Sequence, residues 1–285
     1  MARIAIVGGG NMGEALLAGL LAAGRPARDI VVAERYPQRA RQLADRYSVL
    51  VTSVADAVEH AGVVIVAVKP QDVDSVVEEF AKSVTAAKDG TERVLVTIVA
   101  GLTTAYLESK LPAGAPVVRV MPNTPAKVGA GASGLAKGRF ATSEQVAEVT
   151  ALFECVGTVA IVAEDQLDAV TAVSGSGPAY FFLVVEALVD AGVAAGLSRP
   201  EASDLAVQTM AGSAQMLLLE RGEGAAAGAA GMDTEPARLR AMVTSPGGTT
   251  AAALAELEAG GLRTSIDRAV RAAKTRSEQL RITPE

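Results

Sequence analysis

A glycine motif near the N-terminus constrains the fold of this chain more than any other feature. Gly8-Gly9-Gly10-Asn11-Met12-Gly13 follows the apolar residues 3–7, which end at Val7, and opens a segment of helical composition, residues 11–23. A G-x-G-x-x-G motif between a strand and a helix is typical of dinucleotide-binding units, because its glycines permit a tight turn, close approach to a pyrophosphate and close helix–strand packing. The helix N-terminus adds free N–H groups and partial positive charge. The motif therefore predicts a dinucleotide site that includes Val7.

Strand and helix signals alternate through the N-terminal half. Short apolar runs predict further strands at 29–33, 62–68, 93–99 and 116–121, and a last pair at 131–136 and 157–162. Helical segments are predicted at 37–47 and 71–87. Alternation of this kind indicates an α/β domain with a mostly parallel sheet. We therefore expect a Rossmann domain over residues 1–162.

The pattern changes after residue 162, where strand-like runs disappear. Helices are predicted at 165–173, 178–195, 199–220, 249–259 and 262–280, which indicates an all-α C-terminal domain over residues 163–285. The helix at 178–195 is apolar nearly all round, so we expect it to be buried on every side. A domain of this size cannot easily bury such a helix alone, so a second subunit is expected to cover part of it. The Gly/Ala-rich residues 221–234 predict a flexible surface loop.

Composition excludes several classes of function. The net charge is −6 at pH 7 and no basic cluster is present, which argues against a nucleic-acid partner. The single cysteine, Cys155, cannot form an internal disulfide and is expected to be a buried structural thiol, which fits a cytoplasmic location. The single histidine, His60, is expected to be exposed at a helix end, so no metal site and no Ser-His-Asp triad are predicted.

Two apolar stretches resemble targeting or membrane segments. The N-terminal run is interrupted by the glycine triplet and lacks a cleavage site, so it is not expected to be a secretory signal. The stretch 179–197 has nearly the length of a membrane span, but it carries Glu186 and Asp190 and lacks basic flanks. We therefore expect a buried helix there and no membrane association.

The residues after the second strand bear on the choice of cofactor. Glu34 lies about 20 residues after the last glycine of the motif, where an acid binds the ribose hydroxyls of NAD. The adjacent Arg35 is of the type that holds the 2′-phosphate of NADP. The two residues favour opposite cofactors, so the sequence leaves the choice between NAD and NADP open.

Two further turns are expected near the nicotinamide. Ligands of open α/β sheets bind outside the carboxyl ends of the strands. These ends are predicted at Ala67-Val68-Lys69-Pro70 and at Val99-Ala100-Gly101. Lys69 is equally compatible with an ordinary loop lysine.

The helical half contains two unusual glycine-containing turns. Ser174-Gly175-Ser176-Gly177-Pro178 fits a helix break followed by a cap. Thr244-Ser245-Pro246-Gly247-Gly248-Thr249-Thr250 leads into a helix and offers consecutive N–H groups at its positive end, which suits a carboxylate. A plain helix cap explains this second turn about equally well.

The motifs taken together are similar to those of the pyrroline-5-carboxylate reductase family. The matching segments cover nearly the full length: GGGNMG (8–13), AVKP (67–70), VMPNTPA (120–126), DAVTAVSGSGPAYFF (168–182), EALVDAGVAAGL (186–197) and VTSPGGTTAAALAELE (243–258). The resemblance implies a Rossmann domain, an all-helical dimerisation domain and a homodimer, with rings of dimers such as decamers. It also implies NADP(H) or NAD(H) as cofactor, with NADPH slightly favoured, and (S)-1-pyrroline-5-carboxylate as substrate.

The resemblance also implies roles for particular residues. The substrate carboxylate is expected on the N–H groups of Gly247, Gly248, Thr249 and Thr250, with Ser245 at its edge. The Thr250 hydroxyl is expected to face the imine nitrogen as the catalytic group. Asn123 is expected to shape the pocket near the nicotinamide. Glu34 departs from the small or polar residue that is common where NADP is preferred.

Imine reduction suits a site without histidine, because a protonated iminium is already electrophilic and the protein has mainly to hold two reactants face to face. A β-hydroxyacid dehydrogenase would need a lysine in the helical half, where Lys274 near the C-terminus is the only one. The alternatives that stay open are reduction of another carboxylated cyclic imine and a non-catalytic dinucleotide sensor.

Overall fold

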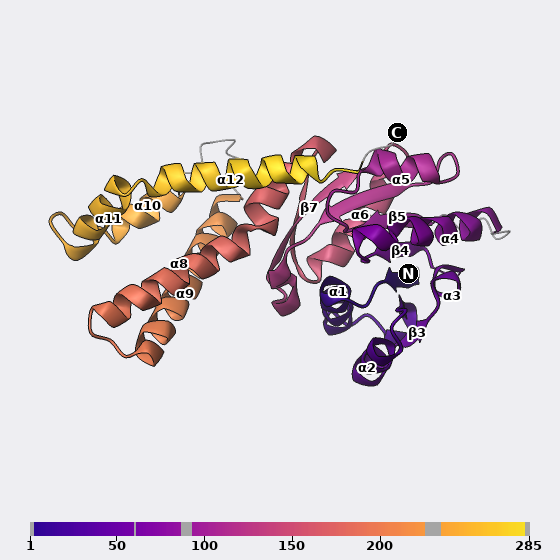
Figure 1. The fold of residues 1–285 in the computed structure, drawn as a ribbon, viewed down its shortest axis with the longest axis horizontal. Helices are drawn as coiled ribbons and strands as arrows, with labels where there is room; N and C mark the ends of the chain where they lie inside the picture. The colour runs from indigo at the N-terminus through magenta and orange to yellow at the C-terminus, as the bar shows by residue number, and fades with distance from the viewer. Residues whose placement is uncertain (1–2, 60, 87–92, 226–234, 283–285) are drawn as a thin grey trace. The chain divides into compact units, whose positions relative to one another are not determined.

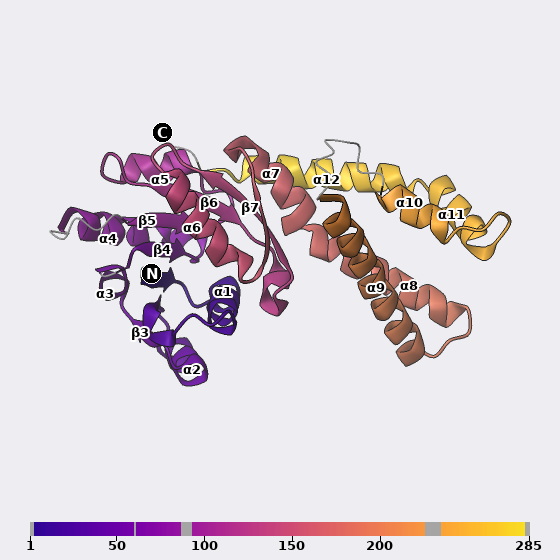
Figure 2. The ribbon, with the colours of Figure 1, turned by 180° about the vertical axis from the view of Figure 1, so that it is seen from behind.

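The computed structural model describes residues 3–59, 61–86, 93–225 and 235–282 (Figures 1 and 2). His60 and residues 226–234 of the predicted loop lie outside the described residues. The described chain forms two compact units, one from Met1–Pro178 with Val270–Glu285 and the other from Ala179–Ala269.

An eight-stranded sheet organises the described part of the first unit. Its strand order is β3-β2-β1-β4-β5-β6-β7-β8, and all neighbours are parallel except β6 and β7. The predicted mostly parallel Rossmann sheet is therefore confirmed. The strands are β1 (Ile4–Val7), β2 (Ile30–Ala33), β3 (Leu50–Thr52), β4 (Val63–Val66), β5 (Val94–Thr97), β6 (Val117–Met121), β7 (Gly131–Lys137) and β8 (Gly157–Ile161).

Helices cover both faces of this sheet. They are α1 (Asn11–Ala22), α2 (Pro37–Tyr47), α3 (Val54–Glu59), α4 (Val73–Ala86), α5 (Thr104–Lys110) and α6 (Ser143–Glu154). Alternate residues of the central strands point to opposite faces. Ile4 and Ile6 pack in one core with α1, α2 and α6, while Ala5 and Val7 pack in a second core with α3, α4 and α5. Burial on both faces explains why these strands are apolar at every position.

Several elements of the first unit were not predicted. The missed elements are β3, α3, α5 and α6. The helix α6 carries a local signal, because Thr142 and Gln145 form a capping box at its start. Cys155 follows α6 and is half-buried against the core, so the expected structural thiol is only partly enclosed.

The C-terminal segment is attached to the first unit. Asp168 is 1% exposed and accepts hydrogen bonds from Ser277 Oγ at 2.6 Å and from Arg281 Nε at 2.5 Å. The Ile282 N–H donates to the Gly101 carbonyl at 2.7 Å. These contacts hold residues 277–282 against the Rossmann unit.

Helices account for the rest of the described chain. They are α7 (Leu167–Val170), followed by a π-helical turn at Thr171–Gly175, α8 (Gly177–Ala194), α9 (Arg199–Ala225), α10 (Glu235–Met242), α11 (Thr249–Ala259) and α12 (Leu262–Gln279). The predicted loop at 221–234 was wrong over 221–225, where α9 continues. Extending an existing helix needs no new nucleation, so α9 continues through this stretch although Gly222 and Gly224 are weak helix formers. The helix α10 was not predicted.

The helix α8 is not buried by its own chain, which corrects the expectation of burial on every side. Phe181, Phe182 and Leu183 are 61%, 63% and 65% exposed. Among the described residues, the helical stretch Glu164–Ala194 alone is long and apolar enough to cross a membrane, with mean hydropathy 1.5 and 17% burial. An apolar surface of this kind also marks a protein interface.

Candidate active site

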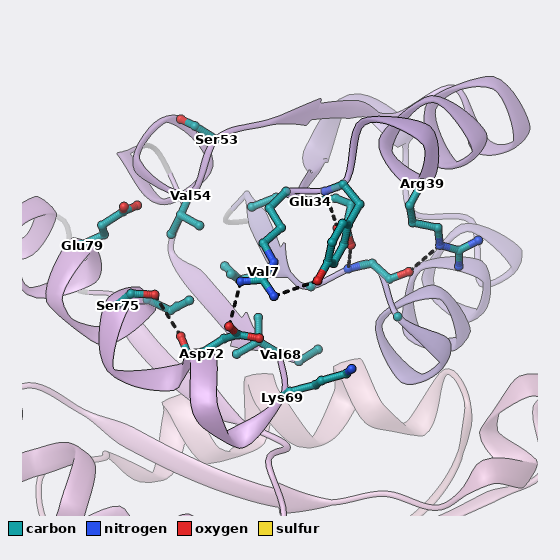
Figure 3. A pocket seen from close by; sticks show the side chains of 18 of the residues that line it. Val7, Glu34, Arg39, Ser53, Val54, Val68, Lys69, Asp72, Ser75 and Glu79 are labelled. Atoms are coloured by element: carbon teal, nitrogen blue, oxygen red, sulfur yellow. Dashed lines mark hydrogen bonds and ion pairs between the residues drawn. The ribbon is translucent and has the colours of Figure 1, made fainter.

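A pocket of about 680 Å³ opens at the carboxyl ends of β1, β2 and β4 in the Rossmann unit (Figure 3). It brings together predicted cofactor residues from three separate turns. These are Val7, Gly8, Gly9, Gly10, Glu34, Arg35, Ala67, Val68 and Lys69. The volume lies within the range of small-molecule sites, and the position follows the rule for open α/β sheets.

The glycine loop has the geometry that its motif predicts. Gly8 has φ +108°, and a Cβ there would lie 2.6 Å from the Ala67 carbonyl oxygen. A Cβ at Gly13 would lie 2.0 Å from the Gly8 carbonyl oxygen, so only glycine lets α1 pack this closely on the loop. No atom lies within 4 Å of a Cβ built at Gly10. This open space is where the backbone can be approached by a pyrophosphate.

Glu34 follows β2 directly and is held by two backbone amides. Its Oε2 accepts from the Gly9 N–H and its Oε1 from the Tyr36 N–H, both at 2.9 Å. The carboxylate therefore bridges the glycine loop and the turn after β2. Each carboxylate oxygen retains capacity for another donor, such as a ribose hydroxyl.

Arg35 is engaged by the opposite wall of the pocket. Its Nη1 lies 2.8 Å from Asp72 Oδ1 and its Nη2 donates to the Tyr36 hydroxyl at 2.8 Å. The hydrogen bond to Tyr36 and the charge of Asp72 raise the pKa of the Arg35 guanidinium. Arg35 is thus cationic, but it already has an acidic partner.

Arg39, in the first turn of α2, lines the pocket and contacts the glycine loop. Its Nε donates to the Gly9 carbonyl at 2.8 Å (Figure 3). Its Nη2 donates to Glu14 Oε2 at 2.6 Å. Glu14 also accepts from Tyr47 Oη at 3.1 Å and from Arg46 Nη1 at 3.2 Å. This cluster fixes the loop against α2.

The remaining predicted cofactor residues lie outside the pocket lining. Asn11, Met12 and Gly13 form the first turn of α1, and Pro70 opens a short 3₁₀ turn, Pro70–Asp72. Ala100 and Gly101 follow β5. A Cβ at Gly101 would lie 2.3 Å from the Leu280 carbonyl oxygen, so this glycine accommodates the C-terminal segment.

More than half of the residues that line the pocket were not predicted from the sequence. The missed lining residues are Ala33, Tyr36, Arg39, Thr52, Ser53, Val54, Ala55, Asp72, Ser75, Val76 and Glu79. Thr52 and Ser53 follow β3, which pairs with β2. The short apolar run before Thr52 was the available signal, and recognising it as a strand would have placed its end beside Glu34.

Asn123 lies between β6 and β7 and is 8% exposed. Its Nδ2 donates to the Ser174 carbonyl oxygen at 3.1 Å and hydroxyl oxygen at 3.2 Å, and its Oδ1 accepts from the Ala132 N–H at 2.9 Å. The Ser174 hydroxyl in turn donates to the Ala132 carbonyl at 2.8 Å. Asn123 therefore ties the π-helical turn, the start of the SGSGP segment, to β7, and it does not line the pocket.

The predicted carboxylate site lies in the second unit, between α10 and α11. The Gly248 N–H donates to the Ser245 carbonyl at 3.0 Å, and Gly247 has φ +69°, which makes a tight turn before Thr249 opens α11. Ser245, Gly247 and Thr249 are exposed, whereas Gly248 and Thr250 are half-buried. The turn presents its amides at the positive end of an 11-residue helix.

Comparison with known families assigns both halves of the chain. Residues 164–280 match the family model described as pyrroline-5-carboxylate reductase dimerisation. Residues 3–101 match the model described as NADP oxidoreductase, coenzyme F420-dependent. The first match places the exposed apolar helix α8 within a dimerisation domain, so the helical part of the chain mediates homo-oligomerisation.

Individual relatives agree over the full length. The pyrroline-5-carboxylate reductase of Mycobacterium tuberculosis is 66% identical, covering 100% of this chain and 99% of that protein. That of Corynebacterium melassecola is 45% identical, covering 98% and 99%. A solved pyrroline-5-carboxylate reductase from Coxiella burnetii has a TM-score of 0.89 at 34% identity, covering 99% of both chains. The pyrroline carboxylate reductase of Plasmodium falciparum, solved with NADP bound, has a TM-score of 0.81 at 28% identity, covering 98% of both. This chain belongs to the pyrroline-5-carboxylate reductase family.

Proposed function

We propose that this chain reduces (S)-1-pyrroline-5-carboxylate to L-proline, the last step of proline biosynthesis, with NAD(P)H as the reductant. The observation that carries the proposal is the pocket of the Rossmann unit, whose glycine loop has dinucleotide-binding geometry, in a chain that matches this family from end to end. Reduction of another carboxylated imine and a sensor role are less favoured, because relatives that match over the full length are pyrroline-5-carboxylate reductases.

The proposed cofactor contacts come from the turns after β1, β2, β4 and β5. The glycine loop leaves open space beside Gly10 and the N-terminus of α1 presents free N–H groups, so together they would hold the pyrophosphate. The turns after β4 and β5 would lie along the nicotinamide half. When bound, the reduced nicotinamide supplies a hydride. The proposed residues are Val7, Gly8, Gly9, Gly10, Asn11, Met12, Gly13, Glu34, Arg35, Ala67, Val68, Lys69, Pro70, Ala100 and Gly101.

The substrate is proposed to bind through its carboxylate at the N-terminus of α11. The proposed donors are the amides of Gly247, Gly248, Thr249 and Thr250, with Ser245 at the edge. The Gly248 amide would have to exchange its hydrogen bond to the Ser245 carbonyl for one to the substrate. The Thr250 hydroxyl orients the ring nitrogen and need not act as a strong acid, since the iminium is already electrophilic. Asn123 is proposed to help shape the pocket near the nicotinamide, and its side chain holds Ser174 within the Rossmann unit.

We further propose that the functional domains divide at residues 1–162 and 163–285. The dimer forms through the helical domain, and dimers assemble into rings such as decamers. The proposed location is the cytoplasm, with no nucleic-acid or membrane partner. The net charge of −6 and the lack of a basic cluster support this assignment.

Thr250→Ala tests the substrate assignment. We expect kcat to fall or KM for pyrroline-5-carboxylate to rise by at least about tenfold, the size of one lost hydrogen bond to a charged group. Binding of NAD(P)H should be unchanged, and Thr250→Ser, which keeps the hydroxyl, should recover most of the activity. Unchanged kinetics for Thr250→Ala would remove this residue from the site.

A further inference from the structure

The part of the pocket that receives the adenosine ribose contains a fixed carboxylate. Both oxygens of Glu34 accept backbone N–H bonds, from Gly9 and from Tyr36 at 2.9 Å each. A Cβ built at Gly9 would lie 3.0 Å from Glu34 Oε2, so the carboxylate lies directly against the glycine loop. The side chain cannot leave this position without giving up both bonds.

Two of the three basic side chains in the pocket lining, Arg35 and Arg39, are already paired with acids. Arg35 is paired with Asp72 at 2.8 Å, and Arg39 with Glu14 at 2.6 Å. The pocket lining contains three basic side chains, Arg35, Arg39 and Lys69, and three acidic ones, Glu34, Asp72 and Glu79. It therefore has no excess of positive charge to receive another phosphate group.

The fixed carboxylate and the paired arginines determine which ribose the pocket favours: one with a free 2′-hydroxyl, as in NADH, or one with a 2′-phosphate, as in NADPH. A carboxylate held at the end of β2 accepts hydrogen bonds from the 2′-hydroxyl of NADH. The 2′-phosphate of NADPH carries close to two negative charges at neutral pH and would approach this same carboxylate. Arg35 and Arg39 already share their charge with Asp72 and Glu14, so neither offers this phosphate an unpaired cation.

We infer that this chain selects NADH over NADPH and that Glu34 sets the preference. The inference rests on the proposed function for the identity of the site as a nicotinamide dinucleotide pocket. It goes beyond the family assignment, which gives NAD(P)H without a choice, and it departs from the slight preference for NADPH that resemblance alone implies.

Cofactor affinity without substrate tests the inference directly. The dissociation constants of NADH and NADPH are measured by titration calorimetry on the full-length protein and on Glu34→Gln and Glu34→Ser. We expect the wild type to bind NADH at least about tenfold more tightly, because close charges at a protein surface interact by more than the energy of a tenfold change. Glu34→Gln, which keeps one acceptor oxygen, should reduce the preference for NADH over NADPH. Glu34→Ser should bind NADPH more tightly than NADH.

A matched control removes a carboxylate elsewhere. Glu148 is exposed on α6, so Glu148→Gln should leave the NADH/NADPH ratio at the wild-type value. Equal or tighter binding of NADPH by the wild type, or an unchanged ratio in Glu34→Gln, would overturn the inference. A protein that shows the expected binding ratio but does not reduce pyrroline-5-carboxylate would contradict the proposed function and leave this inference standing.

Discussion

The side-chain amide of Asn123 donates to both the carbonyl and the hydroxyl oxygen of Ser174, a residue 51 positions later in the chain. Ser174 lies in the π-helical turn that precedes α8. Such turns are rare and frequently occur at functional sites. This relationship explains how a turn of the Rossmann unit holds the start of the SGSGP segment in place.

Asn123→Ala should lower the free energy of unfolding by about 1–3 kcal/mol, because it removes the hydrogen bonds of a buried side chain to half-buried partners at Ser174 and Ala132. Urea denaturation followed by circular dichroism measures the change. Ser109→Ala removes an exposed hydrogen bond to the Tyr106 carbonyl and should change stability by less than about 0.5 kcal/mol. Equal midpoints for Asn123→Ala and the wild type would show that the network does not stabilise the turn.

The second and third glycines of the motif should respond differently to alanine. Gly10→Ala should change stability by less than about 1 kcal/mol, because its Cβ meets open space, yet weaken cofactor binding where the pyrophosphate approaches. Gly13→Ala should destabilise the fold by about 1–3 kcal/mol, because its Cβ would overlap the Gly8 carbonyl. Thermal unfolding and cofactor titration of both variants check this contrast. Tight cofactor binding by Gly10→Ala would argue against the proposed position of the pyrophosphate.

Much of this site was predictable because it depends on local sequence. The runs of β1, β2 and β4 are apolar at every residue, and glycines or charged residues end them, so their carboxyl ends could be placed. Arg39 was not predictable, because its contact with the Gly9 carbonyl depends on how α2 packs on the loop. Gly101 was expected to lie near the cofactor. Its hydrogen bond with Ile282 was not predictable, because the two residues are 181 positions apart and no local signal connects them. For α8, the sequence predicted that a second subunit covers part of the helix, but it did not predict which residues its own chain leaves exposed.

Glu14 should make the stability of the Rossmann unit depend on pH. Burial acts to raise the pKa of this carboxyl, but hydrogen bonds from Arg39 and Tyr47 and the charges of Arg39 and Arg46 lower it below its ordinary value. A lowered folded-state pKa stabilises the fold above the unfolded value of about 4.3, and the stabilisation disappears as the pH falls through the folded value.

Glu14→Gln should therefore lower the urea midpoint at pH 7, and its difference from the wild type should shrink as the pH falls below about 4. Urea titrations between pH 3 and pH 7 measure both effects, with Glu148→Gln as a surface control. A difference that stays constant over this range would show that the ionised carboxylate does not stabilise the unit.

The exposed face of α8 should be required for dimerisation. Phe182→Glu places a charge on an apolar surface and should weaken self-association by at least about tenfold, because a buried unpaired charge is strongly unfavourable. Light scattering coupled to size-exclusion chromatography at micromolar concentration measures the mass. Phe140→Glu, at a partly exposed position of the Rossmann unit, should leave the mass unchanged. A wild-type protein that is monomeric under these conditions would contradict the assignment of α8 to the interface.

The most direct test of the account is the loss of nicotinamide absorbance when the purified protein meets pyrroline-5-carboxylate, with NADH and NADPH in parallel. The account predicts oxidation that requires the substrate, formation of proline in equal amount, and a higher kcat/KM with NADH. A folded protein that binds the cofactor but oxidises neither form in the presence of pyrroline-5-carboxylate would contradict the proposed reaction.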